Sequence, residues 1–146
     1  MPDSEIQETL AFVDCIAWSA ANIRFHEYVD TEHFLLAVVA TESSAASRLL
    51  GKMKAYPSHI SVEINKRHPP GPDCIMMGGP LPHTKHVTAL KKQVLEMKKE
   101  AFREFPTSVV LLIAMLRQEG TSAQSMLTSF GVTEEAVMNA WKAENA

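Results

Sequence analysis

The sequence predicts an all-α fold built from two four-helix repeats that pack on each other with pseudo-twofold symmetry. Apolar residues recur at helical spacing on both sides of one proline- and glycine-rich break, from about residue 67 to 82. Residues 31–39 match residues 107–115 at an offset of 76. Two units are fewer than an open solenoid needs, so we expect them to pack through their most apolar helices.

Four helices are expected in the first half. Ser4 with Gln7 has the form of a capping box for the first helix. Asp30 or Thr31 is expected to cap the second, whose apolar segment 34–39 should be buried on all sides. A third is expected from about Ser43, and a fourth after a turn at Pro57 with Ser58 as its cap. The inward positions should be Leu10, Val13, Ala17, Ala20, Ala21, Ala46, Leu49, Leu50, Met53, Ile60 and Ile64.

The second half repeats this pattern. Thr84 or Thr88 is expected to begin a helix, and Pro106 with Thr107 opens an apolar helix that runs through Leu116. A further helix should end with Gly131 as its C′ residue, and Thr133 should cap the last helix. The inward positions should be Leu90, Val94, Met97, Ala101, Ala123, Met126, Leu127, Phe130, Val137 and Trp141.

We expect residues 1–146 to form one domain, with repeat one at about 4–66, a connector at about 67–83 and repeat two at about 84–143. The connector contains an apolar patch, Ile75 to Met77. We expect this patch to fold back over the groove between the repeats; the alternative is a surface offered to a partner. We expect the chain to be either a free-standing protein or the N-terminal part of a longer one.

Composition argues against several classes of protein. The hydrophobic fraction of 46%, the charged fraction of 21% and the net charge of −3 are typical of a soluble globular protein without the basic face of a nucleic-acid binder. The longest apolar run has eight residues, whereas a membrane helix needs about 20. Cys15 and Cys74 are far apart, and Cys15 falls within an amphipathic pattern that predicts a buried position. We therefore expect a cytoplasmic protein that binds neither membranes nor nucleic acids.

The segment Thr31-Glu32-His33-Phe34-Leu35-Leu36, preceded by Ala20-Ala21, resembles the Clp N-terminal repeat, and residues 4–143 follow that family's pattern in two copies. The resemblance implies eight helices and a non-catalytic module of a chaperone and proteolysis system. Its partners would be components of a Clp-type AAA+ unfoldase and protease, adaptor proteins or tagged substrates. In the ClpC-like branch, the Glu of this motif also helps to bind phosphoarginine on substrates.

The resemblance places a partner-binding site at Thr31, Glu32 and His33. The second copy departs from the motif, because Ser108 and Val109 stand where Glu and His are expected. Any site of this kind should therefore lie on the first repeat. A structural role for Glu32 is the simpler interpretation, since a carboxylate in the first turn of a helix is stabilised by about 0.3–1 kcal/mol. His33 is expected to fix the turn near His26 or Glu27.

Two other functions remain open. A ClpV-like domain would grip a partner helix in a hydrophobic groove beside the first helix. A small metal-dependent hydrolase would use the histidines. His26, Glu27, Glu32 and His33 are close in sequence, and His83 and His86 are three residues apart. The spacing lacks the rigid pattern of a zinc site such as HExxH, and neither a GxSxG elbow nor a P-loop is present. We therefore expect no catalytic residues, no metal and no cofactor.

Overall fold

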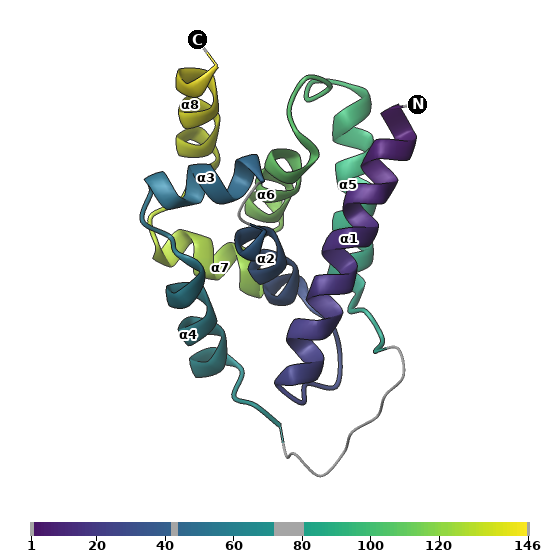
Figure 1. Cartoon of the computed structure of the whole chain (residues 1–146), viewed down its shortest axis with the longest axis vertical. Helices are drawn as coiled ribbons and strands as arrows, with labels where there is room; N and C mark the ends of the chain where they lie inside the picture. The colour runs from purple at the N-terminus through teal and green to yellow at the C-terminus, as the bar shows by residue number, and fades with distance from the viewer. Residues whose placement is uncertain (1, 42–43, 72–80, 146) are drawn as a thin grey trace.

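A computed structural model of the chain describes residues 2–41, 44–71 and 81–145, and these form eight α-helices and no strand (Figure 1). The first four helices are α1 (Pro2–Ile23), α2 (Thr31–Ala40), α3 (Ala45–Lys52) and α4 (Pro57–Arg67). The second four are α5 (Lys85–Lys99), α6 (Thr107–Arg117), α7 (Ser122–Ser129) and α8 (Glu134–Glu144). The predicted all-α class is confirmed.

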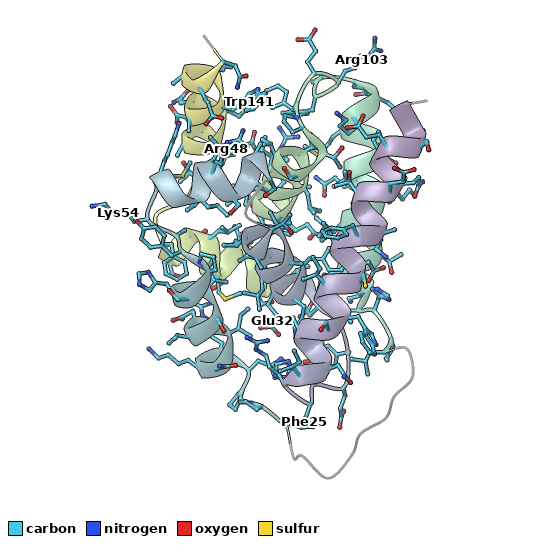
Figure 2. All side chains as sticks on the ribbon, in the orientation of Figure 1. Phe25, Glu32, Arg48, Lys54, Arg103 and Trp141 are labelled. Carbon is cyan, nitrogen blue, oxygen red and sulfur yellow. The ribbon has the colours of Figure 1, made fainter. Side chains whose placement is uncertain are left out.

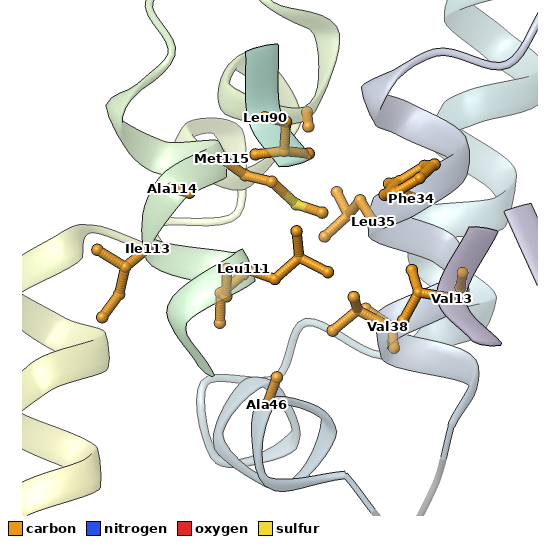
Figure 3. Close-up of a cluster of buried hydrophobic side chains, with 14 of the residues drawn as sticks. Val13, Phe34, Leu35, Val38, Ala46, Leu90, Leu111, Ile113, Ala114 and Met115 are labelled. Atoms are coloured by element: carbon orange, nitrogen blue, oxygen red, sulfur yellow. The ribbon is translucent and has the colours of Figure 1, made fainter. Parts of the chain in front are cut away.

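Helices α2 and α6 form the centre of the hydrophobic core. Nearly all residues of both helices are buried, as their apolar sequences predict. Figure 3 shows Leu35 and Val38 of α2 facing Leu111 and Met115 of α6. Helix α2 also contacts α7, and α6 contacts α3, so each central helix packs against both halves of the chain.

Polar side-chain caps define where four of the eight described helices begin. Asp30 caps α2, Ser44 caps α3, Thr121 caps α7 and Thr133 caps α8, each with a side-chain oxygen that accepts a backbone N–H. Gly131, with a φ of 77°, follows α7 and adopts the left-handed conformation that glycine tolerates.

Several local predictions are wrong. Ser4 lies inside α1, which starts at Pro2, so it is not the cap of that helix. Pro57 is itself the first residue of α4 after Tyr56, because its missing N–H needs no partner there, and Ser58 is helical. Ala101 follows the end of α5 and is exposed. The expected start of the third helix at Ser43 lies outside the described residues, and α3 begins at Ala45.

Both described ends of the connector attach to the loop between α1 and α2. The N–H of Gly71 donates to the carbonyl of Arg24 at 2.9 Å. On the other side, Val29 donates to the carbonyl of Pro82 at 2.9 Å and accepts from Thr84 at 3.0 Å. The predicted patch from Ile75 to Met77 lies outside the described residues. The loop at residues 24–30 is therefore the point where α1, α2, the end of α4 and the start of α5 meet.

Among the described residues, no single helix is long and apolar enough to cross a membrane. Helices α2 and α3 together have the length and apolar composition of a membrane-spanning segment, but they are bent by 90° relative to each other.

Candidate functional site

The three residues predicted to bind a partner form the first turn of α2, and all three are buried. Thr31 and His33 are fully buried, and Glu32 retains only 3% of its exposure. Figure 2 shows Glu32 between the lower parts of α1 and α4. What reaches these side chains therefore depends on the residues that cover them.

His33 joins α2 to the preceding loop. Its Nδ1 accepts a hydrogen bond from the N–H of Asp30 at 2.9 Å, while the Asp30 carboxylate caps the helix. This is a capping box in which histidine takes the place usually held by Glu or Gln. The expectation that His33 fixes the turn is confirmed, and its other nitrogen lies 2.8 Å from Nδ1 of His26.

The direction of these hydrogen bonds follows from elementary chemistry. Nδ1 of His33 accepts a hydrogen bond from the N–H of Asp30, so a neutral His33 ring must carry its own proton on Nε2. That Nε2–H donates to Nδ1 of His26, and His26 therefore carries its proton on Nε2, which donates to the carbonyl of His68 at 3.1 Å. The bonds form one directed chain from Asp30 through His33 and His26 to the end of α4.

Glu32 is covered by His68, a residue that the sequence did not suggest. Nδ1 of His68 donates to Oε1 of Glu32 at 2.7 Å, and the His68 side chain is 27% exposed. Arg24 lies close enough to affect the charge of Glu32, but its own hydrogen bonds go to Ala20, Ser61 and Asn65. His68 and Glu32 are separated by 36 positions in the sequence, which explains why no local pattern revealed this contact.

Three rings are stacked at this place. The imidazoles of His26 and His68 are parallel within 4°, with centroids 3.5 Å apart, and the ring of Tyr28 lies 5.5 Å from His68 on a 23° tilt. An open pocket lies beside the stack, and its lining includes Phe25, Glu27 and Pro69. His68 thus stands between this pocket and Glu32.

Burial controls the protonation of the cluster. Burial, followed by electrostatic repulsion from His26, His68 and Arg24, lowers the pKa of His33 to about 3. Burial is also the largest cause of the lowered pKa of His26. Burial raises the pKa of Glu32, and the hydrogen bond from His68 works against this increase. Both buried imidazoles are therefore neutral at pH 7, as the hydrogen-bond chain requires.

The ligand atoms of His26, Glu32, His33 and His68 lie within 4.8 Å of one another, so a metal ion must be considered. Two features of the geometry oppose one. A metal lies near the plane of each imidazole that binds it, at about 2.0–2.1 Å, and no point lies in both parallel planes of His26 and His68, 3.5 Å apart. In addition, the nitrogen of His33 that faces the cluster carries a proton. In this arrangement the four residues form a hydrogen-bonded cluster, and the absence of a metal stays a prediction.

Thr31 contacts a different part of the structure from Glu32 and His33, namely the start of α7. Its Oγ1 accepts the N–H of Ala123 at 3.3 Å and lies 3.3 Å from Oγ of Ser122, both in the first turn of α7. In the second half, Oγ of Ser108 accepts the N–H of Ala46 at 3.3 Å, at the start of α3. The residue that replaces the expected Glu of the second motif is therefore a hydrogen-bond acceptor between the two halves.

The remaining candidate residues do not join the cluster. His83 lies 2.7 Å from a carboxylate oxygen of Asp14, which also pairs with Lys91. His86 lies in α5, and its carbonyl accepts a hydrogen bond from Gln118. Cys15 is exposed, so the prediction that it is buried is wrong. Cys74 lies outside the described residues.

The chain was compared with models of protein families and with curated proteins, and neither comparison gave a match. No protein-family model matches the chain, and no curated protein matches it at a significant level.

Proposed function

We propose that this chain is a non-catalytic protein-binding module of the Clp N-terminal type, with two four-helix repeats related by a pseudo-twofold axis. In this role it docks adaptors or substrates for a Clp-type AAA+ unfoldase and its protease. The two-repeat arrangement is supported by reciprocal contacts: α2 touches α7 where α6 touches α3, and α1 pairs with α2 as α5 pairs with α6.

The observation that carries the proposal is a pair of similar hydrogen bonds across the two halves, in which the donors are matched positions and the acceptors differ by one position, since Thr31 matches Thr107 and Ser108 matches Glu32. Thr31 at the start of α2 accepts the N–H of Ala123 in α7, and Ser108 at the start of α6 accepts the N–H of Ala46 in α3. Ala46 and Ala123 are themselves matched positions in the sequence repeat. Each central helix thus accepts a hydrogen bond from a helix of the other half, which supports a double repeat. The proposed function is inferred from the resemblance of that repeat to the Clp family.

The partner site is proposed at the first turn of α2, around Glu32. A buried carboxylate needs a hydrogen-bonding partner, and here that partner is a single, partly exposed side chain, His68. A partner group that replaces His68 would be held by a charged acceptor in surroundings that exclude water. The second repeat has Ser108 at the matched position, so the site occurs once.

A second candidate function is supported by α1, which exposes large apolar side chains. Phe12 is 55% exposed and Ile23 is 69% exposed, and Ile16, partly buried, lies on the same side of the helix. Spacings of four and seven residues place these three side chains in one stripe, which suits the apolar face of a partner helix. This is the ClpV-like alternative, in which α1 and not Glu32 holds the partner.

Capture from lysate of the source organism, with the captured proteins identified by mass spectrometry, tests the proposal. Wild type should retain an AAA+ unfoldase, its peptidase or an adaptor, and Glu32→Ala should retain much less. Glu119→Ala is the matched control, because Glu119 is exposed beyond α6. Failure of wild type to capture any such component contradicts the proposed function.

The same capture distinguishes the two binding surfaces. If the partner lies on α1, then Phe12→Ser combined with Ile23→Ser should abolish capture while Glu32→Ala leaves it unchanged. If the partner lies at Glu32, Glu32→Ala should abolish capture and the double variant of Phe12 and Ile23 should leave it unchanged. Far-ultraviolet circular dichroism of each variant shows whether the helices are retained.

A further inference from the structure

Helix α5 and the turn after it carry a large share of the positive charge of the chain. Residues 85–103 contain six of the 14 Lys and Arg residues but only two of the 17 Asp and Glu residues. The remainder of the chain is therefore acidic, although the net charge of the whole is only −3. In Figure 1, α5 lies on the side of the molecule opposite α4 and α8. Positive charge is thus gathered on one helix at one side.

Two of the five lysines in α5 already have partners within the fold. Lys91 pairs with Asp14 of α1, and Nζ of Lys98 donates to two backbone carbonyls of the turn that follows α5. The three other lysines are exposed, and none forms an ion pair with a residue that the structure describes; they are Lys85, Lys92 and Lys99. Their charge is available to a partner.

The three free lysines lie on one face of α5. They recur every seven residues, a spacing that drifts by only about 20° around a helix at each step. The rise per residue separates successive lysines by about 10 Å along the axis. On the same face, the exposed Ala89 lies between the first two lysines, and the exposed Glu96 lies between the last two. We call these five residues the α5 stripe: Lys85, Ala89, Lys92, Glu96 and Lys99.

The α5 stripe is unfavourable for the helix itself. Lys85 is the first residue of α5, where the helix dipole favours an anion, and the first turn contains no acidic residue. Lys92 precedes Glu96 by four residues, which is the less favourable order for an ion pair in a helix, and the two side chains do not pair. A carboxylate from outside would relieve the repulsion at Lys85. The stripe is therefore better explained by a partner than by the stability of α5.

Glu96 distinguishes between classes of anionic partner. The phosphates of a nucleic acid and the surface of an anionic membrane carry negative charge throughout, which Glu96 would repel in the middle of the contact. A protein helix can instead place carboxylates opposite the lysines and a basic side chain opposite Glu96, since its own side chains recur on one face every seven residues. The small side chain of Ala89 leaves room for such a helix to approach.

We propose that the α5 stripe docks an acidic helix of a partner protein, whose carboxylates lie seven residues apart and face Lys85, Lys92 and Lys99. The stripe contains none of the residues around Glu32. The inference therefore goes beyond the proposed function and does not depend on it.

A synthetic helical peptide of about 18 residues tests the stripe, because it spans the roughly 21 Å from Lys85 to Lys99. The peptide carries three Glu at intervals of seven residues and one Lys that can face Glu96. In an NMR titration at pH 7.5 and low ionic strength, the backbone amides that shift should lie in α5. Lys92→Glu combined with Lys99→Glu should weaken binding about tenfold, since two ion pairs become like-charge repulsions.

A matched variant controls for net charge. Lys66 and Lys142 are also exposed and outside any ion pair among the described residues, but they lie in α4 and α8. Lys66→Glu combined with Lys142→Glu changes the net charge by the same amount and should bind the peptide nearly as wild type does. A peptide of the same composition with scrambled charges should bind several-fold more weakly.

Glu96→Lys tests the class of partner. It should weaken binding of the patterned peptide, whose Lys then faces a like charge, and strengthen binding of an oligothymidylate, whose charge is uniformly negative. Circular dichroism shows whether each variant keeps its helices. Lys92→Gln combined with Lys99→Gln serves the main comparison if the charge-reversed variant loses them, and it should also weaken binding.

Four results overturn the inference: no shift of amides in α5, equal loss of binding in the two double variants, equal binding of the patterned and scrambled peptides, or tighter binding of oligothymidylate or anionic phospholipid vesicles than of the patterned peptide by wild type. The measurement uses a synthetic peptide and no Clp component. It therefore fails separately from the proposed function.

Discussion

Acidification should destabilise the fold through His33 before the surface carboxylates respond. The pKa of His33 is about 3 in the folded protein, against 6.5 for an ordinary histidine. Between these two values the unfolded chain binds a proton that the folded protein does not, so stability falls as the pH falls. At pH 5, about 1.5 pH units below the unfolded pKa, the free energy of unfolding should be about 2 kcal/mol lower than above pH 7.5.

The physical reason lies in the directed hydrogen-bond chain. A proton added to His33 must go to Nδ1, where it meets the N–H of Asp30, so two donors face each other and the capping box is lost. A proton added to His26 goes to its Nδ1 and meets the Nε2–H of His33. The lowered pKa of His26 adds to the loss of stability, whereas the raised pKa of Glu32 offsets part of it near pH 5.

Urea unfolding at pH 7.5, 6.5, 5.8 and 5.0 measures this dependence. Above pH 5 the carboxylates with lowered pKa values still carry most of their charge in both states; they are Asp14, Glu63, Glu134 and Glu144. The matched variant is His33→Gln, because glutamine at this helix position also bonds the cap N–H and does not titrate. It should flatten the profile. A wild-type profile that is flat, or as steep as that of His33→Gln, refutes the reasoning.

Two paired substitutions test other parts of the structure by urea unfolding at pH 7.5. Gly71→Ala should lower the free energy of unfolding by about 1–3 kcal/mol, because its Cβ would lie 2.3 Å from the carbonyl oxygen of Phe25. Gly51→Ala in α3 places a Cβ that meets no atom within 4 Å, and it should raise the free energy of unfolding by about 0.5–1 kcal/mol. Equal effects contradict the close approach of Gly71. Thr31→Val should cost about 1 kcal/mol, since it removes the acceptor of the Ala123 N–H. The same change at Thr107 should be neutral or stabilising, because Oγ1 of Thr107 is buried without a hydrogen-bond partner; a loss there as large as at Thr31 contradicts the assignment.

The spacing of apolar residues predicted the helices well, because the residues that a helix buries must recur along one of its faces. Ala46, Leu49 and Leu50 of α3 are buried as expected, and so are Ile60 and Ile64 of α4. Local rules were less reliable at the helix ends. A serine followed by Gln at N3 suggests a cap wherever it occurs, yet at Ser4 the chain continues as helix back to Pro2.

The candidate site was predicted only in part, and the missing part is long-range. The motif at Thr31 to His33 was found from sequence, and His33 was expected to fix the turn near His26 or Glu27. Nothing local suggested His68, which reaches Glu32 because α4 returns to the loop at residues 24–30. The proposed role of the cluster as a hydrogen-bonded network, rather than a metal site, depends on ring planes and on the direction of each hydrogen bond.

The two matched halves of the sequence differ at one residue for a physical reason. Asp30, before α2, has an N–H that His33 must satisfy, and this need brings His26 and the end of α4 into the network. The matched residue before α6 is Pro106, which has no N–H. Val109, at the position of His33, therefore leaves no donor unsatisfied and can be buried as an apolar side chain. The proposed partner site therefore depends on Asp30 and His33, whose matched residues Pro106 and Val109 offer no corresponding hydrogen bond.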